Sequence, residues 1–270
     1  MRASRLLFLT ALPALVIFIA FWLLPVSRLV LVGASGKEGL AAYLSVVTND
    51  IYRASLVNTV LLSAAAALVS VGVAAVVGVY LQRREFRGKR VVVSLLTFPL
   101  AFPGVVVGFL VILLAGRQGL IGQVSEQLGM EKVVFAYSLA GLFLGYLYFS
   151  IPRCVLTLMA AAEKLDPALE EAARSLGASP WRVVIDVIVP ALGPALVASA
   201  AICFATGMGA FGTAFTLASK INVLPITIYS EFTNYANFAA AASLSLVLGV
   251  LTWLILMAAR SLSGQGSAAA

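Results

Sequence analysis

Long apolar segments alternate with short polar ones along most of this chain. Each apolar segment is longer than the roughly 20 residues that an α-helix needs to cross the hydrocarbon core of a bilayer. The pattern therefore predicts an all-α membrane protein with six transmembrane helices. The apolar runs cover residues 6–32, 56–81, 91–115, 134–160, 191–217 and 238–259.

The first apolar run permits two interpretations. It follows Arg2 and Arg5, and a basic start also precedes the apolar region of a signal peptide. That region is usually only about 7–15 residues long, which is much shorter than residues 6–32. We therefore favour an uncleaved first span, followed by an external loop over residues 33–54.

Proline and glycine interrupt two of the runs. Pro99 and Pro103 predict a kink or break in the third run, and Pro194 with the glycines of residues 207–212 predicts a bent or interrupted fifth helix. Broken helices in membranes line cavities or are covered by protein, so we expect a cavity beside residues 204–216, which in a transporter would be the translocation path. Close packing against another helix would use the same glycines. The candidate path residues are Phe204, Met208, Gly209, Phe211 and Gly212.

One polar stretch, residues 166–190, has the pattern of two short helices joined by a turn. Asp166 is a favourable N-cap for the first helix and Ser179 for the second, and a proline follows each of them. Gly177 suits the left-handed position that ends a helix. Apolar residues recur at helical spacing in both halves. They are Leu169, Ala172, Ala173 and Leu176, then Trp181, Val184, Ile185 and Ile188.

We call residues 166–190 the docking element, because two apolar faces between two spans cannot both lie in the bilayer core. The element either engages a partner protein or rests at the membrane interface as an amphipathic hairpin, and the pattern alone leaves both interpretations open. Glu170 and Arg174 stand four residues apart with the acid first, which is the favourable order for a helix ion pair.

The spacing within the docking element resembles a known motif. Glu171, Ala172 and Ala173 precede Gly177 by the same interval as in the EAA loop of permease subunits of binding-protein-dependent ABC importers. That pattern ends nine residues later in Ile-x-Leu-Pro, and the present chain has Val-Ile-Val before Pro190. The resemblance covers about residues 55–260. It implies a methionine-importer-like type I ABC permease fold with a cytoplasmic coupling helix.

The same resemblance implies an organisation and a set of contact residues. Residues 1–54 would form an N-terminal helix with an external loop, residues 55–260 the permease core with a coupling loop at 161–190, and residues 261–270 a C-terminal tail. The residues implied to contact an ATPase are Glu170, Glu171, Ala172, Ala173, Arg174, Gly177, Ala178, Ser179 and Pro190.

The implied partners lie on both sides of a bacterial inner membrane. They are two ABC ATPase subunits, a second permease subunit that is identical or homologous, and an extracytoplasmic substrate-binding protein. This sequence contains no G-x-x-x-x-G-K-[ST] loop and no histidine, so we expect a transport subunit without enzymatic activity or cofactor. ATP and Mg²⁺ would bind to the partner ATPase.

The distribution of positive charge predicts the topology. The net charge is +7, but the basic residues gather at the ends of the apolar runs, which argues against nucleic-acid binding. With both termini in the cytoplasm, the inner side holds twelve of the 18 lysines and arginines. These include Arg153, for which we expect a position near the membrane interface or a carboxylate partner in the docking element, with substrate contact as the alternative.

The transported solute is less well defined by the sequence. Residues 163–166 and 177–179 resemble the polyamine branch, which suggests spermidine or putrescine, with iron(III), thiamine or aminoethylphosphonate as alternatives. A secondary transporter without an ATPase would be expected to carry carboxylates inside its spans, and here the acids fall in loops or span ends. Cys154 and Cys203 follow no metal-binding spacing and are interpreted as small core residues.

Overall fold

The computed structural model describes residues 11–36, 39–217 and 221–262, and all regular structure in these ranges is helical. Six segments within them are long and apolar enough to cross a membrane, which confirms the predicted all-α fold. Arg2, Arg5, Lys37, Lys220 and the tail from residue 263 lie outside the described residues. The spanning segments are Ala11–Gly33, Asp50–Arg83, Gly104–Gln127, Leu139–Glu163, Pro180–Met208 and Phe238–Ser261.

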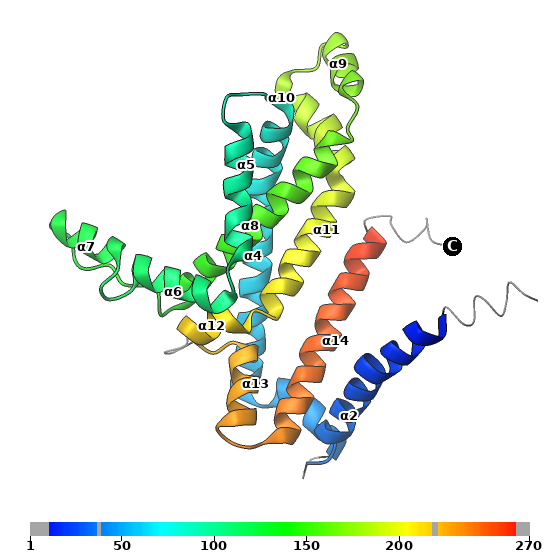
Figure 1. Ribbon diagram of the computed structural model, residues 1–270, viewed down its shortest axis with the longest axis vertical. Helices are drawn as coiled ribbons and strands as arrows, with labels where there is room; N and C mark the ends of the chain where they lie inside the picture. The colour runs from blue at the N-terminus through cyan, green and yellow to red at the C-terminus, as the bar shows by residue number, and fades with distance from the viewer. Residues whose placement is uncertain (1–10, 37–38, 218–220, 263–270) are drawn as a thin grey trace, which may run out of the picture.

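Short helical turns connect the long helices (Figure 1). The first half of the chain contains η1 (Ile19–Leu23), α2 (Leu24–Gly33), η2 (Gly39–Tyr43), α3 (Ser45–Thr48), α4 (Asp50–Arg83), α5 (Lys89–Thr97), η3 (Phe98–Ala101), α6 (Gly104–Ala115) and α7 (Leu120–Gln127). The second half contains α8 (Leu139–Glu163), α9 (Pro167–Ser175), α10 (Pro180–Val183), η4 (Val184–Ile188), α11 (Val189–Met208), α12 (Phe211–Leu217), α13 (Leu224–Thr233) and α14 (Phe238–Leu262).

Helix α4 is the central element and packs on α8 and α11 (Figure 1). Small residues allow this close packing: a Cβ atom added at Gly78 would lie only 3.2 Å from the Cβ atom of Leu158. With 34 residues, α4 is about 51 Å long, whereas the hydrocarbon core of a bilayer is about 30 Å thick. Helix α4 therefore extends beyond the hydrocarbon core.

Polar contacts fix the first turns of α4 to α13, at the opposite end of the molecule from α9 (Figure 1). The hydroxyl of Thr59 accepts a hydrogen bond from the backbone N–H of Leu224 at 2.8 Å. Thr227 donates to the hydroxyl of Ser55 at 2.9 Å. Because Ser55 and Thr59 are buried, these bonds join the two helices where water cannot compete for them.

The third apolar run differs from its prediction. The expected break is confirmed, because η3 and the residues up to Pro103 separate α5 from α6. However, residues 91–115 do not form one span: α6 and α7 project sideways from the lower end of α5 (Figure 1), and the segment able to cross a membrane is Gly104–Gln127. The reason is that Pro103 cannot donate the backbone hydrogen bond that would continue the earlier helix.

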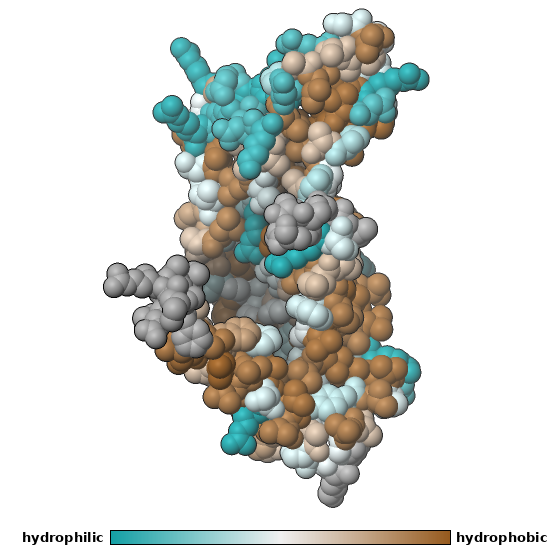
Figure 2. Space-filling view, turned by 90° about the vertical axis from the view of Figure 1, so that its right-hand side faces the viewer, coloured by the Kyte–Doolittle hydropathy of each residue, from teal (hydrophilic) through white to brown (hydrophobic). Residues whose placement is uncertain are grey.

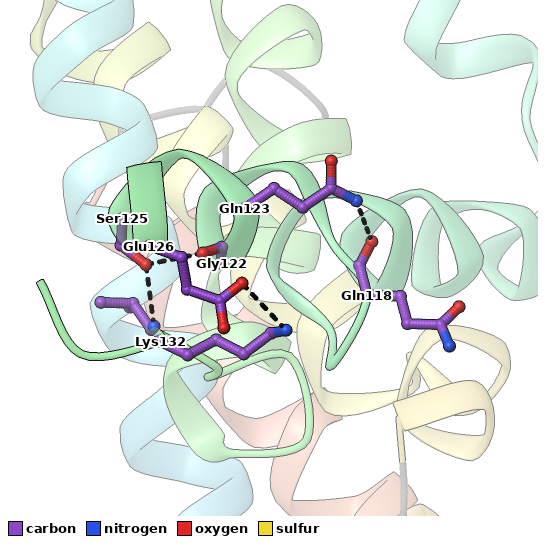
Figure 3. Close-up of polar contacts among 7 residues, drawn as sticks. Gln118, Gly122, Gln123, Ser125, Glu126 and Lys132 are labelled. Carbon is purple, nitrogen blue, oxygen red and sulfur yellow. Dashed lines mark hydrogen bonds and ion pairs between the residues drawn. The ribbon is translucent and has the colours of Figure 1, made fainter. Parts of the chain in front are cut away.

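The segment between the third and fourth apolar runs, residues 116–133, is also partly helical, because it contains α7. Figure 3 shows how its polar side chains fold the following turn back onto the helix. The hydroxyl of Ser125 donates to the carbonyl of Gly122 at 2.8 Å and accepts from the N–H of Val133 at 3.1 Å. Lys132 and Glu126 form an ion pair at 3.2 Å. This segment is therefore a folded hairpin.

Helix α12 packs against the beginning of α6. The hydroxyl of Thr213 donates to the carbonyl of Gly104 at 3.0 Å, and that of Thr216 donates to the carbonyl of Val105 at 3.2 Å. A Cβ atom added at Gly108 would lie 2.6 Å from the Cβ atom of Thr216 and 3.1 Å from the carbonyl oxygen of Thr213. The G-x-x-x-G pattern of residues 104–108 thus permits the close helix approach expected of it.

This contact gives a prediction for stability. Gly108→Ala should lower the thermal unfolding midpoint in detergent, because overpacking typically costs about 1–3 kcal/mol. Gly72→Ala is the matched control, since an added Cβ atom at Gly72 meets nothing within 4 Å and alanine favours a helix. A Gly108→Ala midpoint equal to or above that of Gly72→Ala would contradict the packing described here.

Candidate docking element and polar cavity

The two helices of the docking element begin where the sequence predicts. The carboxylate of Asp166 accepts from the N–H of Ala168 at 2.9 Å at the start of α9. The hydroxyl of Ser179 accepts from the N–H of Arg182 at 3.4 Å at the start of α10. A proline occupies the first turn of each helix. These caps fix the orientation of both chain segments locally.

Gly177 ends α9 with a left-handed backbone, as predicted, at a φ angle of 86°. Its N–H bonds to the carbonyl of Arg174 at 2.9 Å, and the N–H of Ala178 bonds to the carbonyl of Ala173 at 3.1 Å. This pair of bonds defines a Schellman motif. Ala173 and Ala178 pack against a cluster that includes Val183, so the turn is closed on its inner side by apolar contact.

An ion pair fastens α9 to the end of α4. A guanidinium nitrogen of Arg83 lies 2.5 Å from a carboxylate oxygen of Glu170, and Arg174 lies 3.6 Å from the other oxygen. The side chain of Glu170 is only 14% exposed and that of Arg83 only 25%. The Arg83–Glu170 contact is an ion pair, and its atoms are not aligned as a hydrogen bond requires.

Sequence reasoning anticipated the Arg174 contact because helical spacing reveals it, but it missed Arg83. Only the basic cluster at residues 83–90 hinted that this end of α4 lies on the same side of the membrane as the docking element. The pair shows that the α4–α5 connection and the docking element lie at one end of the molecule. Figure 2 shows hydrophilic side chains gathered at that end.

The outer surface of the docking element combines one acid with large apolar side chains. Glu171 and Ala172 are exposed, and Leu176 and Trp181 are 90% and 71% exposed. The apolar stripe expected along α9 is therefore divided, since Ala173 faces the protein while Leu176 faces away from it. Such a surface is suited to a partner that supplies both an apolar groove and hydrogen-bond donors.

The end of the docking element differs from the prediction. The sequence separates the docking element, which ends at Pro190, from the apolar run that starts at residue 191, but the chain is helical without a break from Pro180 to Met208. The wider π-helical turn η4 precedes Pro190 and accommodates the backbone hydrogen bond that proline cannot make. The second half of the docking element is thus continuous with the fifth span.

A partly open cavity of about 330 Å³ lies where η3, α8, α11 and α12 meet. It contains the break between α11 and α12 that the glycines at residues 207–212 predict. Of the five expected path residues, Gly209, Phe211 and Gly212 line it. Its other lining residues are Pro99, Leu100, Phe102, Gly104, Phe149, Arg153, Thr206, Ala210 and Thr213.

The remaining two expected path residues lie elsewhere. Phe204 and Met208 are buried in a cluster with Cys154, Cys203 and other residues of α4 and α8. Both residues lie on the packed side of α11, and the opposite side of this helix lines the cavity. The sulfur atoms of Cys154 and Cys203 lie 2.9 Å apart in this cluster, which agrees with their interpretation as core residues.

The structure gives Arg153 a hydroxyl partner in place of a carboxylate of the docking element, which was one of the contacts expected for it. Its guanidinium donates to the hydroxyl of Thr206 at 2.8 Å, and Thr206 donates to the carbonyl of Ile202 at 2.8 Å. Arg153 stands ten residues before Glu163, the last residue of α8, which places it about 15 Å along the axis from that end. The side chain therefore lines the cavity and does not reach the docking element.

Comparisons with known proteins agree with this arrangement. Residues 74–263 match the family described as "Binding-protein-dependent transport system inner membrane component". The chain is 33% identical to the sulfate transport system permease protein CysT of Escherichia coli, over 84% of this chain and 81% of that protein. It is 31% identical to a probable molybdenum ABC transporter permease protein of Haloferax volcanii, over 89% of this chain and 85% of the relative.

Solved structures share the fold. A bacterial alginate ABC transporter, crystallised with a periplasmic protein that holds an alginate pentasaccharide, matches with a TM-score of 0.81 and 18% identity. That match covers 97% of this chain and 95% of the other chain. The methionine ABC transporter MetNI in an inward-facing conformation matches with a TM-score of 0.57 and 19% identity, over 80% of this chain and 98% of the other.

Proposed function

Because the chain belongs to the family of binding-protein-dependent transport system inner membrane components, we propose that it is the permease subunit of an ABC importer for a small tetrahedral oxyanion, molybdate or sulfate. The relatives named above, which are permeases for molybdenum and sulfate, support this substrate class. The structural observation that supports an oxyanion substrate is the cationic side chain of Arg153 in the cavity at the helix break.

This substrate class replaces the polyamine suggested by the motif sequence. The molybdenum and sulfate relatives align along most of the chain, whereas the polyamine resemblance rested on a few residues around the docking element. A polyamine is a polycation, and among the described residues that line the cavity the one charged side chain is the positive Arg153. Iron(III) and thiamine are cations too, so the same repulsion disfavours them, and the alternative aminoethylphosphonate also carries a positive amine.

Permeases of type I importers work with ATPase subunits and a substrate-binding protein, and we propose the same assembly here. Two ATPases, which bind ATP and Mg²⁺, would receive the docking element from two permease subunits, this chain and an identical or related one. Glu171, Ala172 and Leu176 would enter the ATPase groove. Because η4 joins α10 to α11 without a break, ATPase closure would move the fifth span together with the docking element.

The topology follows from the same proposal. The docking element must face the ATP-containing side, and the Arg83–Glu170 pair then places the basic residues 83–90 in the cytoplasm as well. With six spans, both termini are cytoplasmic, which agrees with the excess of positive charge on that side. A proteolytic or cysteine-labelling map that exposes Leu176 to the extracytoplasmic medium would contradict this topology.

The substrate proposal is tested with the complete importer in proteoliposomes. We expect ATP-dependent uptake of radiolabelled molybdate or sulfate in the presence of the cognate binding protein, and no uptake of spermidine. Omitting the ATPase is the control, because a secondary transporter would continue to move solute down an imposed ion gradient. Spermidine uptake, or oxyanion uptake without the ATPase, would overturn the proposal.

The exposed apolar surface gives a second expected result. Leu176→Asp should lower both ATPase recruitment and uptake about ten-fold, because a charged carboxylate would have to be desolvated in the ATPase groove. Leu176→Met, which stays apolar and of similar volume, should retain both activities. Co-purification with the ATPase and uptake measure the two effects. Wild-type recruitment by Leu176→Asp would show that this surface does not contact the ATPase.

A further inference from the structure

A charged side chain in the interior of a spanning helix requires an explanation. α8 has 25 residues and is about 37 Å long, and Arg153 lies well inside it. Placing arginine at the centre of a spanning helix costs about 2.5–3.5 kcal/mol even on the most favourable scales. Membrane proteins retain such residues where they face a cavity, pair with another group, or lie on the path of a transported ion.

Within the described ranges, no acid forms an ion pair with Arg153 that would offset this cost. Among the described residues its recorded polar contact is the hydroxyl of Thr206, and the ion pairs of this part of the chain involve other side chains. A guanidinium carries five N–H donors in a planar fork, so one bond leaves most of them available. The residues lining the cavity include no acid that could accept from the others.

The surroundings of Arg153 suit a small anion. Gly209 and Gly212 leave the wall of the cavity without side chains near the helix break, and Phe149 and Phe211 form apolar parts of the wall. Apolar walls lower the local dielectric, which strengthens the attraction between a guanidinium and an anion. The volume of about 330 Å³ lies at the small end of the roughly 300–1,000 Å³ typical of ligand pockets.

A larger cavity at the other end of the molecule does not share these properties. It has a volume of about 660 Å³ and lies between the N-terminal loop and the start of α14. The described residues that line it are uncharged, and Asn49 and Asn237 are among them. These residues offer an anion no counter-charge, whereas Arg153 supplies one in the cavity at the helix break.

We propose that Arg153, positioned by Thr206, binds the transported oxyanion as a transient subsite on the translocation path. The guanidinium fork would donate two hydrogen bonds to two oxygens of a tetrahedral dianion, a geometry to which arginine is well suited. The subsite rests on the proposed oxyanion function and adds to it a residue that recognises the solute inside the membrane. Because Arg153 is a single point of contact, it would hold the anion weakly enough for the anion to leave again, as transport requires.

The alternative role of Arg153 is purely structural, as a cross-link between α8 and α11 through Thr206. Three substitutions separate the two roles. Arg153→Gln removes the charge but keeps a donor for Thr206, Arg153→Lys keeps the charge, and Thr206→Val removes the cross-link but leaves the guanidinium. If Arg153 acts as a charged subsite, only Arg153→Gln severely impairs transport. If Arg153 acts as a cross-link, Thr206→Val impairs it severely.

The experiment uses the complete importer, with its ATPase and binding protein, in proteoliposomes. For Arg153→Gln we expect radiolabelled sulfate or molybdate uptake to fall at least about ten-fold, while ATP hydrolysis stimulated by the binding protein and the thermal unfolding midpoint change little. Arg153→Lys keeps the charge without the fork, and Thr206→Val keeps the guanidinium without its positioning partner. Each should therefore lower uptake only about three-fold, clearly less than Arg153→Gln does. Wild-type uptake by Arg153→Gln, or a loss in Thr206→Val as large as in Arg153→Gln, would overturn the subsite.

Two further outcomes are distinguishable. If the wild-type importer transports neither oxyanion but carries another solute, the proposed function fails and the subsite fails with it. If Arg153→Gln does not assemble, Arg153→Lys becomes the deciding variant. Uptake lowered no more than about three-fold, with a shifted ratio of sulfate to molybdate uptake, supports contact between this side chain and the anion. An unchanged preference in Arg153→Lys would then contradict it, because the point charge of lysine cannot reproduce the bidentate fork.

Discussion

Glu170→Arg is expected to reduce solute uptake by the assembled importer at least about ten-fold while the protein still inserts and folds. The substitution places a third positive charge beside Arg83 and Arg174, which now share the carboxylate of Glu170. Breaking a largely buried ion pair by changing one partner costs up to about 3–5 kcal/mol, and a change of about 1.4 kcal/mol already shifts an equilibrium ten-fold. Uptake and ATP hydrolysis measured side by side would reveal hydrolysis that no longer drives transport.

The matched control is the exchanged pair. Arg83→Glu alone should impair uptake as Glu170→Arg does, and the double variant should recover a substantial part of it, because opposite charges again face each other. A double-mutant cycle measures this coupling directly. A coupling energy below about 0.5 kcal/mol, the additivity error for independent sites, would show that the pair does not hold the docking element to α4.

Gly177→Val is expected to reduce uptake by a similar factor for a different reason. Gly177 has a φ angle of 86°, and a β-branched side chain is strongly disfavoured in this left-handed conformation. No atom lies within 4 Å of an added Cβ atom, so the effect comes from the backbone and not from a clash. The strained turn would change the angle between α9 and α10 and move Leu176 away from its partner.

Gly177→Asn is the control for this second prediction, because asparagine tolerates the left-handed region far better than valine. It should retain most of the uptake that Gly177→Val loses, and both variants should reach the membrane in equal amounts. Equal transport by the valine and asparagine variants would show that the conformation of this turn is not needed for coupling.

The sequence was most informative where local physics determines the structure. The caps at Asp166 and Ser179 and the left-handed Gly177 depend on neighbouring backbone groups, so their positions could be predicted residue by residue. The six apolar spans follow from length and composition in the same way. Residues that line the helix break, such as Gly209, were found because glycine marks an interrupted membrane helix.

Contacts between distant parts of the chain could not be predicted in this way. The pairing of Arg83 with Glu170 joins residues far apart in sequence, and no periodicity relates them. For Arg153 the sequence leaves the membrane interface, a carboxylate partner and substrate contact all open, and it does not reveal the cavity that this side chain lines. The continuity of the docking element with the fifth span depends on the turn η4, which no distinctive composition marks in the sequence.

The contacts at the two ends of α4 make this helix suited to transmit force along the molecule. One of its ends is hydrogen-bonded to α13, and the other is ion-paired with α9, so a single stiff helix joins the docking element to the opposite end of the molecule. In the proposed importer, ATPase closure on the docking element would tilt this helix and displace α13 in the opposite sense. Opening on one side and sealing on the other would then be one mechanical event.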